Sequence, residues 1–121
     1  MRSGIMAGVI YKIVTRGQWS AGERTRAFDG APVGIEDGFI HLSDAGQVRE
    51  TAQKHFAGQQ ELLLVAVDAA SLGALLVWEP SRGGQLFPHL YGKLHLDSVI
   101  WVRELPPGED GRHLFPAELP S

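Results

Sequence analysis

The stretch Asp37-Gly38-Phe39-Ile40-His41-Leu42-Ser43-Asp44 joins a short strand pattern to the start of a helix pattern. Strand alternation puts Phe39, His41 and Ser43 on one face and the aliphatic residues between them on the other. Backbone N–H groups at a helix N-terminus favour a phosphate or carboxylate. We therefore interpret this stretch as one half of a ligand site and residues 87–92 as the other half.

Composition predicts one globular domain. The 121 residues are 44% hydrophobic and 21% charged, which suffices for a core without metal or disulfide staples. We expect a single domain over residues 1–121, with an ordered core at about residues 8–105 and an irregular C-terminal tail at residues 106–121. The absence of cysteine excludes disulfides, thiolate metal sites and cysteine nucleophiles.

Charge and hydropathy limit the partners. The formal charge is −3 and the basic residues are scattered, so no footprint for duplex nucleic acid is expected. No stretch approaches the roughly 20 apolar residues that span a bilayer, and the apolar patch at residues 6–11 is too short for an export signal. We expect a cytoplasmic protein, as a monomer or weak dimer, without a membrane partner.

The order of patterns predicts an α+β fold with small mixed or mostly antiparallel sheets and two to three helices. Apolar and β-branched runs favour strands at residues 9–14, 61–68, 75–80 and 96–105, the second of them central and buried. Thr15 and Gln18 match a capping box, which favours a helix over residues 16–22. Apolar spacing predicts a second helix over residues 44–57, capped by Ser43 or Asp44. Residues 22–38 are expected to form a surface loop.

Two candidate catalytic residues are His41 and Glu79. Glu79 ends an apolar strand beside a proline, at a sheet rim where burial would raise its pKa into the range for acid–base work. The alternatives are a hydrogen-bonded structural histidine at position 41 and an exposed strand end at position 79. Ser43 is a candidate ligand contact whose alternative role is the helix cap.

Cations and rings supply the candidate ligand contacts. Lys12 on the first strand and Arg82 in a Gly-rich loop could hold a phosphate or carboxylate, although both are also explained as solvated side chains. Phe87, His89 and Tyr91 could stack on and orient a planar ring, or could simply cover the core. The spacing of the histidines fits no familiar zinc pattern, so no metal site is expected.

With Gly38-Phe39-Ile40-His41-Leu42-Ser43 and Phe87-Pro88-His89-Leu90-Tyr91-Gly92 in hand, the chain resembles the domain of unknown function 952 family of bacterial and plant proteins. The resemblance runs from about residue 10 to residue 105. It implies the fold and brings no established activity with it.

At a greater distance the chain resembles the ADP-ribosyltransferase-like fold, which binds NAD in a cleft between two small sheets. That resemblance implies Lys12, His41 and Glu79 as the polar site residues, with lysine where many relatives carry histidine or arginine on the first strand. The leading hypothesis is binding of an NAD- or ADP-ribose-type nucleotide, with transfer or hydrolysis of the ADP-ribosyl group. NAD would then be a substrate, and the sequence indicates no certain cofactor. The alternative is a non-catalytic module that binds a small molecule or ADP-ribose. Whether the protein is an enzyme stays open at this point.

Overall fold

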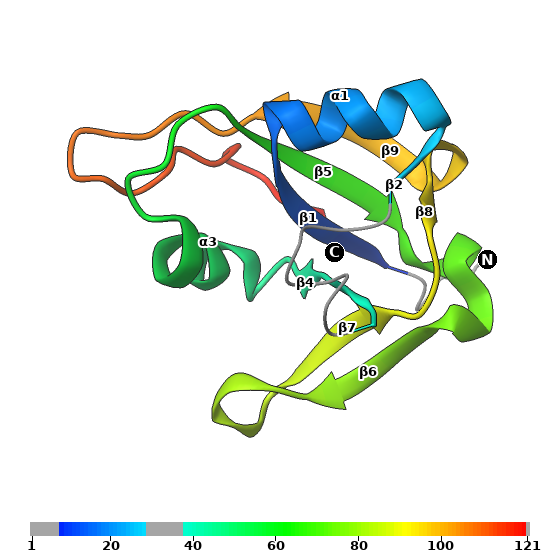
Figure 1. Cartoon of the computed structure of the whole chain (residues 1–121). Helices are drawn as coiled ribbons and strands as arrows, with labels where there is room; N and C mark the ends of the chain where they lie inside the picture. The colour runs from blue at the N-terminus through cyan, green and yellow to red at the C-terminus, as the bar shows by residue number, and fades with distance from the viewer. Residues whose placement is uncertain (1–7, 29–37, 121) are drawn as a thin grey trace.

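A computed structural model describes residues 8–28 and 38–120 and shows antiparallel sheets flanked by helices (Figure 1). The strands are β1 (Val9–Thr15), β2 (Ala27–Phe28), β3 (Ile40–His41), β4 (Ser43–Asp44), β5 (Leu62–Asp68), β6 (Leu76–Pro80), β7 (Leu86–Leu90), β8 (Leu94–His95) and β9 (Val99–Glu104). The helices are α1 (Arg16–Thr25) and α3 (Val48–Phe56), with 3₁₀ turns at Ala69–Leu75, Arg82–Gly84 and Leu96–Ser98. The expected α+β fold is confirmed, and every strand pair in these ranges is antiparallel.

The larger sheet has the strand order β4-β1-β5-β9. β1 pairs with β5 along its whole length, from Val9 opposite Asp68 to Thr15 opposite Leu62. β5 is buried from Leu62 to Val67, because it lies between two strands and carries apolar side chains on both faces. The expectation of a central, doubly buried strand is therefore confirmed.

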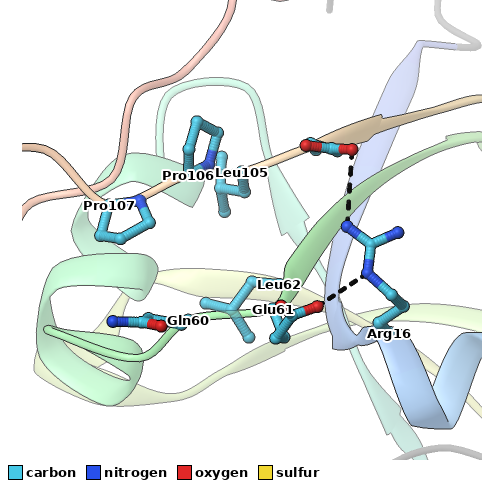
Figure 2. Close-up of a pocket in the computed structure, with 8 residues that line it drawn as sticks. Arg16, Gln60, Glu61, Leu62, Leu105, Pro106 and Pro107 are labelled. Atoms are coloured by element: carbon cyan, nitrogen blue, oxygen red, sulfur yellow. Dashed lines mark hydrogen bonds and ion pairs between the residues drawn. The ribbon is translucent and has the colours of Figure 1, made fainter.

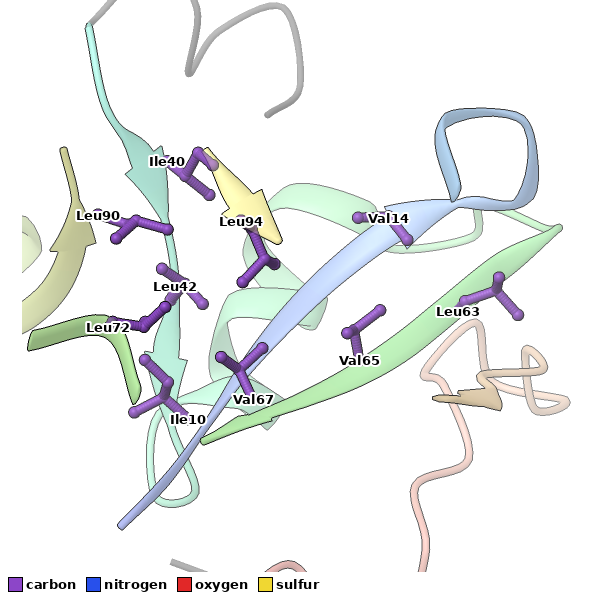
Figure 3. Close-up of a cluster of buried hydrophobic side chains, with 10 residues drawn as sticks. All are labelled: Ile10, Val14, Ile40, Leu42, Leu63, Val65, Val67, Leu72, Leu90 and Leu94. Atoms are coloured by element: carbon purple, nitrogen blue, oxygen red, sulfur yellow. The ribbon is translucent and has the colours of Figure 1, made fainter. Parts of the chain in front are cut away.

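Each face of this sheet carries its own apolar core, and each core is closed by one helix. The first core consists of Ile10, Val14, Ile40, Leu42, Leu63, Val65, Val67, Leu72, Leu90 and Leu94 (Figure 3), with Trp19 of α1 packed against it. The second core consists of Tyr11, Ile13, Val48, Ala52, Leu62, Leu64, Ala66 and Leu105, and includes the buried side of α3. Adjacent residues of β1 alternate between the two cores, as strand geometry requires.

A single extended segment connects the two main sheets. β3 pairs with β7 in the three-stranded sheet β3-β7-β6, whereas β4, two residues further on, pairs with β1 in the larger sheet. At the change of partner, the Leu42 N–H donates to the carbonyl of Pro88 at 3.1 Å. Because Ile40 and Leu42 both enter the first core, His41 between them faces away from it.

The C-terminal tail is irregular in backbone but lies on the second core. Phe115 and Leu119 pack against that core, and the Tyr11 hydroxyl donates to the carbonyl of Pro120. The buried His113 donates through Nε2 to the carbonyl of Gln59 at 2.8 Å. The tail thereby ties the last strand back to β1 and to the end of α3.

Several predicted boundaries differ from those observed. α1 continues to Thr25 and keeps the predicted capping box, in which Gln18 N–H donates to Thr15 Oγ1 at 3.0 Å. The second helix begins at Val48 rather than at residue 44, because the reciprocal Asp44–Gln47 hydrogen bonds close a turn before it. The last strand begins at Val99, since the preceding residues form a 3₁₀ turn. The predicted loop over residues 22–38 lies largely outside the described residues.

The segment from Phe87 onward, to which the sequence assigned no regular element, belongs to strand β7, which pairs with both neighbouring strands of its sheet. The turn before it places Gly83 at φ 64° and Gly84 at φ 81°, a conformation that favours glycine. No helix within the described ranges is long and apolar enough to cross a membrane.

Lys12 carries a charge into the first core. It lies on β1 between Ile10 and Val14, opposite Val65, and is only 7% exposed. Burial lowers the pKa of its ammonium group to about 8. Because the unfolded chain holds this proton up to a pKa of about 10.4, the native state is penalised when the group is protonated.

We expect Lys12→Met to stabilise the fold at pH 7 by about 1–3 kcal/mol, since the variant removes this desolvated charge. The advantage should be complete below pH 8 and should shrink as the pH rises toward about 10.4, where both states of the wild type become neutral. Urea unfolding at several pH values measures it. Lys54→Met on the exposed side of α3 is the matched control, and an equal effect of both variants would contradict the explanation.

Candidate functional site

Polar and aromatic side chains gather on the face of the three-stranded sheet that points away from the first core. We call this set, which consists of Phe39, His41, Glu79, His89 and Tyr91, the outer-face cluster. The register of the strand pairs determines where these residues lie. His41 lies opposite His89 across β3 and β7, and Val77 lies opposite His89 across β7 and β6. Since alternate residues share a face, Glu79 and Tyr91 project on the same side as His89.

One carboxylate oxygen organises the polar half of the cluster. The Nδ1–H of His89 donates to Glu79 Oε1 at 2.7 Å, and the hydroxyl of Tyr91 donates to the same oxygen at 2.7 Å. The imidazole is 6% exposed, and the carboxylate is 35% exposed. The hydrogen bond from His89 and then that from Tyr91 lower the pKa of Glu79, so its carboxylate is ionised at neutral pH. The sequence expectation of a raised Glu79 pKa is therefore wrong, because hydrogen bonding outweighs desolvation there.

The same contact acts on Tyr91 in the opposite sense. The pKa of its phenol is raised, first by the hydrogen bond to Glu79 and then by desolvation. Tyr91 therefore stays protonated and acts as a donor. Its ring is 42% exposed, so the phenol spans from the carboxylate to solvent.

Phe39 forms the aromatic half of the cluster. Its ring stacks on His89 with centroids 4.2 Å apart and planes 26° apart, and it lies 5.2 Å from the ring of Tyr91. The imidazole of His41 lies 4.7 Å from Phe39 and meets His89 edge to face at 5.4 Å. The arrangement is a set of rings around one anionic oxygen.

This geometry supports acid–base and electrostatic chemistry. A histidine whose Nδ1 is held by a carboxylate presents Nε2 in a defined direction, as in catalytic dyads. The second oxygen of Glu79 accepts no hydrogen bond from the described residues, so it is available to a ligand. An ionised carboxylate beside aromatic faces suits a cationic or electron-poor ring.

Four residues predicted from the sequence lie elsewhere or differ in role. Lys12 lies on β1 between Ile10 and Val14, whose side chains enter the first core, whereas His41 faces away from that core. Ser43 is 4% exposed and shares a 2.9 Å hydrogen bond with Thr51, which fastens β4 to α3; this hydroxyl does not cap the helix. Phe87 lies opposite Glu79 across β7 and β6, on the same face as His89, but is 5% exposed. The backbone of Arg82 lies in the turn between β6 and β7.

Phe39 is the residue that sequence reasoning left out of the site. The signal was present, because strand alternation placed Phe39 on the same face as His41. Its partners on β7 could not be identified without the register. Metal binding is not supported in the described part of the chain, where no group of three or more His, Asp or Glu side chains could hold an ion.

A separate shallow hollow of about 230 Å³ lies where α1 meets the ends of β5 and β9 (Figure 2). Arg16 crosses its edge, with Nε 2.9 Å from Glu61 and a terminal nitrogen 3.5 Å from Glu104. These three charged side chains are about half exposed or more, so solvent screens their attraction. Their geometry serves to fix the start of α1, whose first N–H also donates to the Glu61 carbonyl.

The chain belongs to the DUF952 family, described as a protein of unknown function, whose pattern matches residues 13–102. A crystal structure of protein CC0527 from Caulobacter crescentus is 46% identical, with a TM-score of 0.85 over 88% of this chain and 93% of that one. A solution NMR structure of CC0527 is 47% identical, with a TM-score of 0.78 over 86% of this chain and 90% of that one. No curated protein matches the chain.

Tyr91→Phe should raise the pKa of Glu79, because the variant keeps the ring and removes one of the two hydrogen bonds that favour the ionised carboxylate. Carbon-detected NMR titration of the Glu79 carboxyl measures the change. Tyr11→Phe is the matched control, since the Tyr11 hydroxyl bonds Pro120 instead. A Glu79 titration that is identical in the Tyr91→Phe variant and the wild type would contradict the assigned network.

Proposed function

We propose that the outer-face cluster binds a nucleotide of the NAD or ADP-ribose type and transfers or hydrolyses its ADP-ribosyl group. The observation that carries this proposal is the Glu79 carboxylate, which is held by His89 and Tyr91 on one oxygen and free of described partners on the other. It is therefore an oriented anion at a surface lined with rings. Such a group is suited to stabilising positive charge that develops on a bound sugar.

The chemistry follows from cleavage of the N-glycosidic bond of NAD. The bonding electrons leave with nicotinamide, and the ribose carbon becomes an oxocarbenium ion opposite Glu79. The nucleophile, water or an acceptor hydroxyl, then bonds to that carbon and releases a proton. An imidazole of the cluster, His89 through Nε2 or His41, is the base that would take it.

The aromatic residues supply the recognition of rings. Tyr91 is partly exposed and Phe39 lies between it and the two imidazoles, so a nicotinamide or adenine ring has faces to stack on. In the sequence-based hypothesis this role fell to Phe87 and Tyr91. Phe39 takes the place of the buried Phe87 in the proposal.

The sheet arrangement lends further support. The distant resemblance to the ADP-ribosyltransferase-like fold implies two small sheets that meet at a cleft, and in this protein two antiparallel sheets meet at the segment that contains β3 and β4. The polar residue implied on the first strand is Lys12, which lies beside the first core, whereas His41 faces away from that core. We therefore assign the chemistry to the outer-face cluster without Lys12.

Glu79→Gln should abolish NAD turnover while leaving NAD binding within about threefold, because the amide keeps the shape and loses the charge needed in the transition state. Chromatographic detection of nicotinamide and calorimetric titration with NAD measure the two quantities. Glu50→Gln on the exposed side of α3 is the control. Turnover by Glu79→Gln at the wild-type rate would remove Glu79 from the mechanism.

A non-catalytic binding module is the second candidate. It is favoured by the burial of the His89 imidazole, which is only 6% exposed and therefore poorly placed to take a proton from an attacking water. A thermal-shift screen against NAD, ADP-ribose, mononucleotides and glutathione separates the two candidates. A ligand present at 100 times its Kd stabilises the fold by about 2.7 kcal/mol. Stabilisation without product would favour the module, and no response to any compound would argue against both.

Phe39→Leu should weaken nucleotide binding by about two- to thirteenfold, since loss of a stacked ring costs about 0.5–1.5 kcal/mol. Calorimetry with ADP-ribose measures the effect. Phe115→Leu, in the tail on the second core, is the matched aromatic control. Equal affinities of the wild type and Phe39→Leu would show that Phe39 does not contact the ligand.

A further inference from the structure

We propose that the unpaired edge of β6 binds an extended segment of another protein as an additional antiparallel strand. β6 is the last strand of its sheet, so β7 pairs with one side of it only (Figure 1). The main-chain groups along such an edge can pair with a strand that comes from outside. The binding surface consists of this edge and the apolar side chains around it.

Apolar side chains gather around the edge of β6. Seven large apolar side chains are exposed in the described part of the chain, and five of them lie on the β6–β7 hairpin or next to its ends. These five are Leu75, Val77, Trp78, Leu86 and Tyr91. Trp78 is 43% exposed although it stands in the middle of its strand. Exposed aromatic and aliphatic side chains that cluster in this way are typical of a surface that contacts another protein.

The edge strand of the larger sheet lacks this character. That strand, β9, carries Arg103 and Glu104, and its pairing with β5 contains an irregularity in register. Charges and bulges are the usual means by which proteins keep a foreign strand from adding to an edge. In β6 the only charge and the only proline occupy the last two positions. The first three residues, Leu76, Val77 and Trp78, are therefore apolar and without such protection.

The hydrogen bonds to β7 determine which main-chain groups of β6 face outward. The Tyr91 N–H donates to the Leu75 carbonyl at 2.8 Å, and the register continues from there without a shift. Every second residue from Leu75 to Glu79 therefore directs its main-chain groups toward β7. The main-chain groups of residues 76, 78 and 80 point away from the sheet.

These outward groups are rich in acceptors and poor in donors. The Leu76 N–H already donates to the Gly73 carbonyl, and Pro80 has no N–H. Along β6 the edge thus offers one donor, the Trp78 N–H, and three carbonyl acceptors. An extended segment with a free N–H at every second residue satisfies all of these groups. A second copy of β6 does not, because carbonyls of the two edges would face each other.

The side chains beside the edge specify the chemistry of the segment. Residues that lie opposite each other in paired strands share a face, so the residue opposite Trp78 meets the indole. Its two neighbours lie opposite Val77 and Glu79 on the outer face. Glu79 presents a carboxylate oxygen that has no described partner. The segment therefore carries an arginine or lysine opposite Glu79, an aromatic residue opposite Trp78 and a β-branched residue opposite Val77.

The test is binding of the synthetic peptide acetyl-Ser-Thr-Arg-Phe-Val-Thr-Ser-amide, followed by NMR titration of the protein's amides. When its Phe lies opposite Trp78, antiparallel pairing puts its Arg opposite Glu79. We expect saturable binding with a Kd below about 1 mM and slower hydrogen exchange of the Trp78 amide. Methylation of the Phe nitrogen, which faces the edge, should weaken binding at least about tenfold. Methylation of the Val nitrogen, which faces away, should change the Kd by less than about threefold.

Matched variants of the protein test the side-chain contacts. Trp78→Ala should weaken peptide binding about tenfold or more, because buried tryptophans dominate interface energies. Ile100→Ala removes a similarly exposed side chain from β9 and should leave the Kd unchanged. Glu79→Gln should weaken binding of the arginine peptide about two- to fivefold, as for an exposed ion pair, and should leave a peptide with glutamine at that position unaffected.

Three results would overturn the proposal. They are the absence of saturable binding, equal affinities of the two methylated peptides, and dimerisation that Trp78→Ala abolishes in a protein that binds no peptide. The last result would assign the edge to a second copy of the chain. No nucleotide enters these measurements, so failure of peptide binding leaves the proposed NAD chemistry standing, and absence of NAD turnover leaves this inference standing.

Discussion

The architecture depends on one five-residue segment that serves two sheets. Residues 40 and 41 pair with β7, and residues 43 and 44 pair with β1, while the Leu42 N–H still bonds to the β7 side. Alternation continues through the change of partner, so Ile40 and Leu42 enter one core together. A shift of one residue in either pairing would turn both out of the core, which is why apolar burial holds the register on both sides at once.

The outer-face cluster is a consequence of that register. Once the aliphatic residues of β3 and β7 are committed to the core, the residues between them must face outward, and His41 meets His89. Glu79 reaches the same ring because it lies two residues from Val77, the partner of His89 on β6. The hydrogen bonds of His89 and Tyr91 to Glu79 therefore arise from regular strand geometry. They replace hydrogen bonds that these groups would otherwise form with water.

Features that depend on neighbouring residues could be predicted from the sequence, whereas contacts between distant strands could not. The capping box at Thr15 and the doubly buried β5 depend on local patterns, and both could be predicted from the sequence. The contact between Glu79 and His89 depends on the length and conformation of the turn at residues 81–85, which local patterns describe only as flexible. The direction of the Glu79 pKa shift failed for the same reason: a strand end indicates desolvation, whereas the decisive donors come from another strand.

The burial of Lys12 could not be predicted from the sequence pattern. Lys12 lies between Ile10 and Val14 on a strand that is buried on both faces, so β1 has no solvent-exposed side on which a lysine could be placed. An apolar residue at this position would satisfy the fold better, since the native state must carry a desolvated ammonium group. A residue that lowers stability where a simple alternative exists is expected when the side chain does something else. The pH dependence of Lys12→Met examines that argument, because the stability lost to the desolvated ammonium group should disappear once the group is neutral in both the native and the unfolded state.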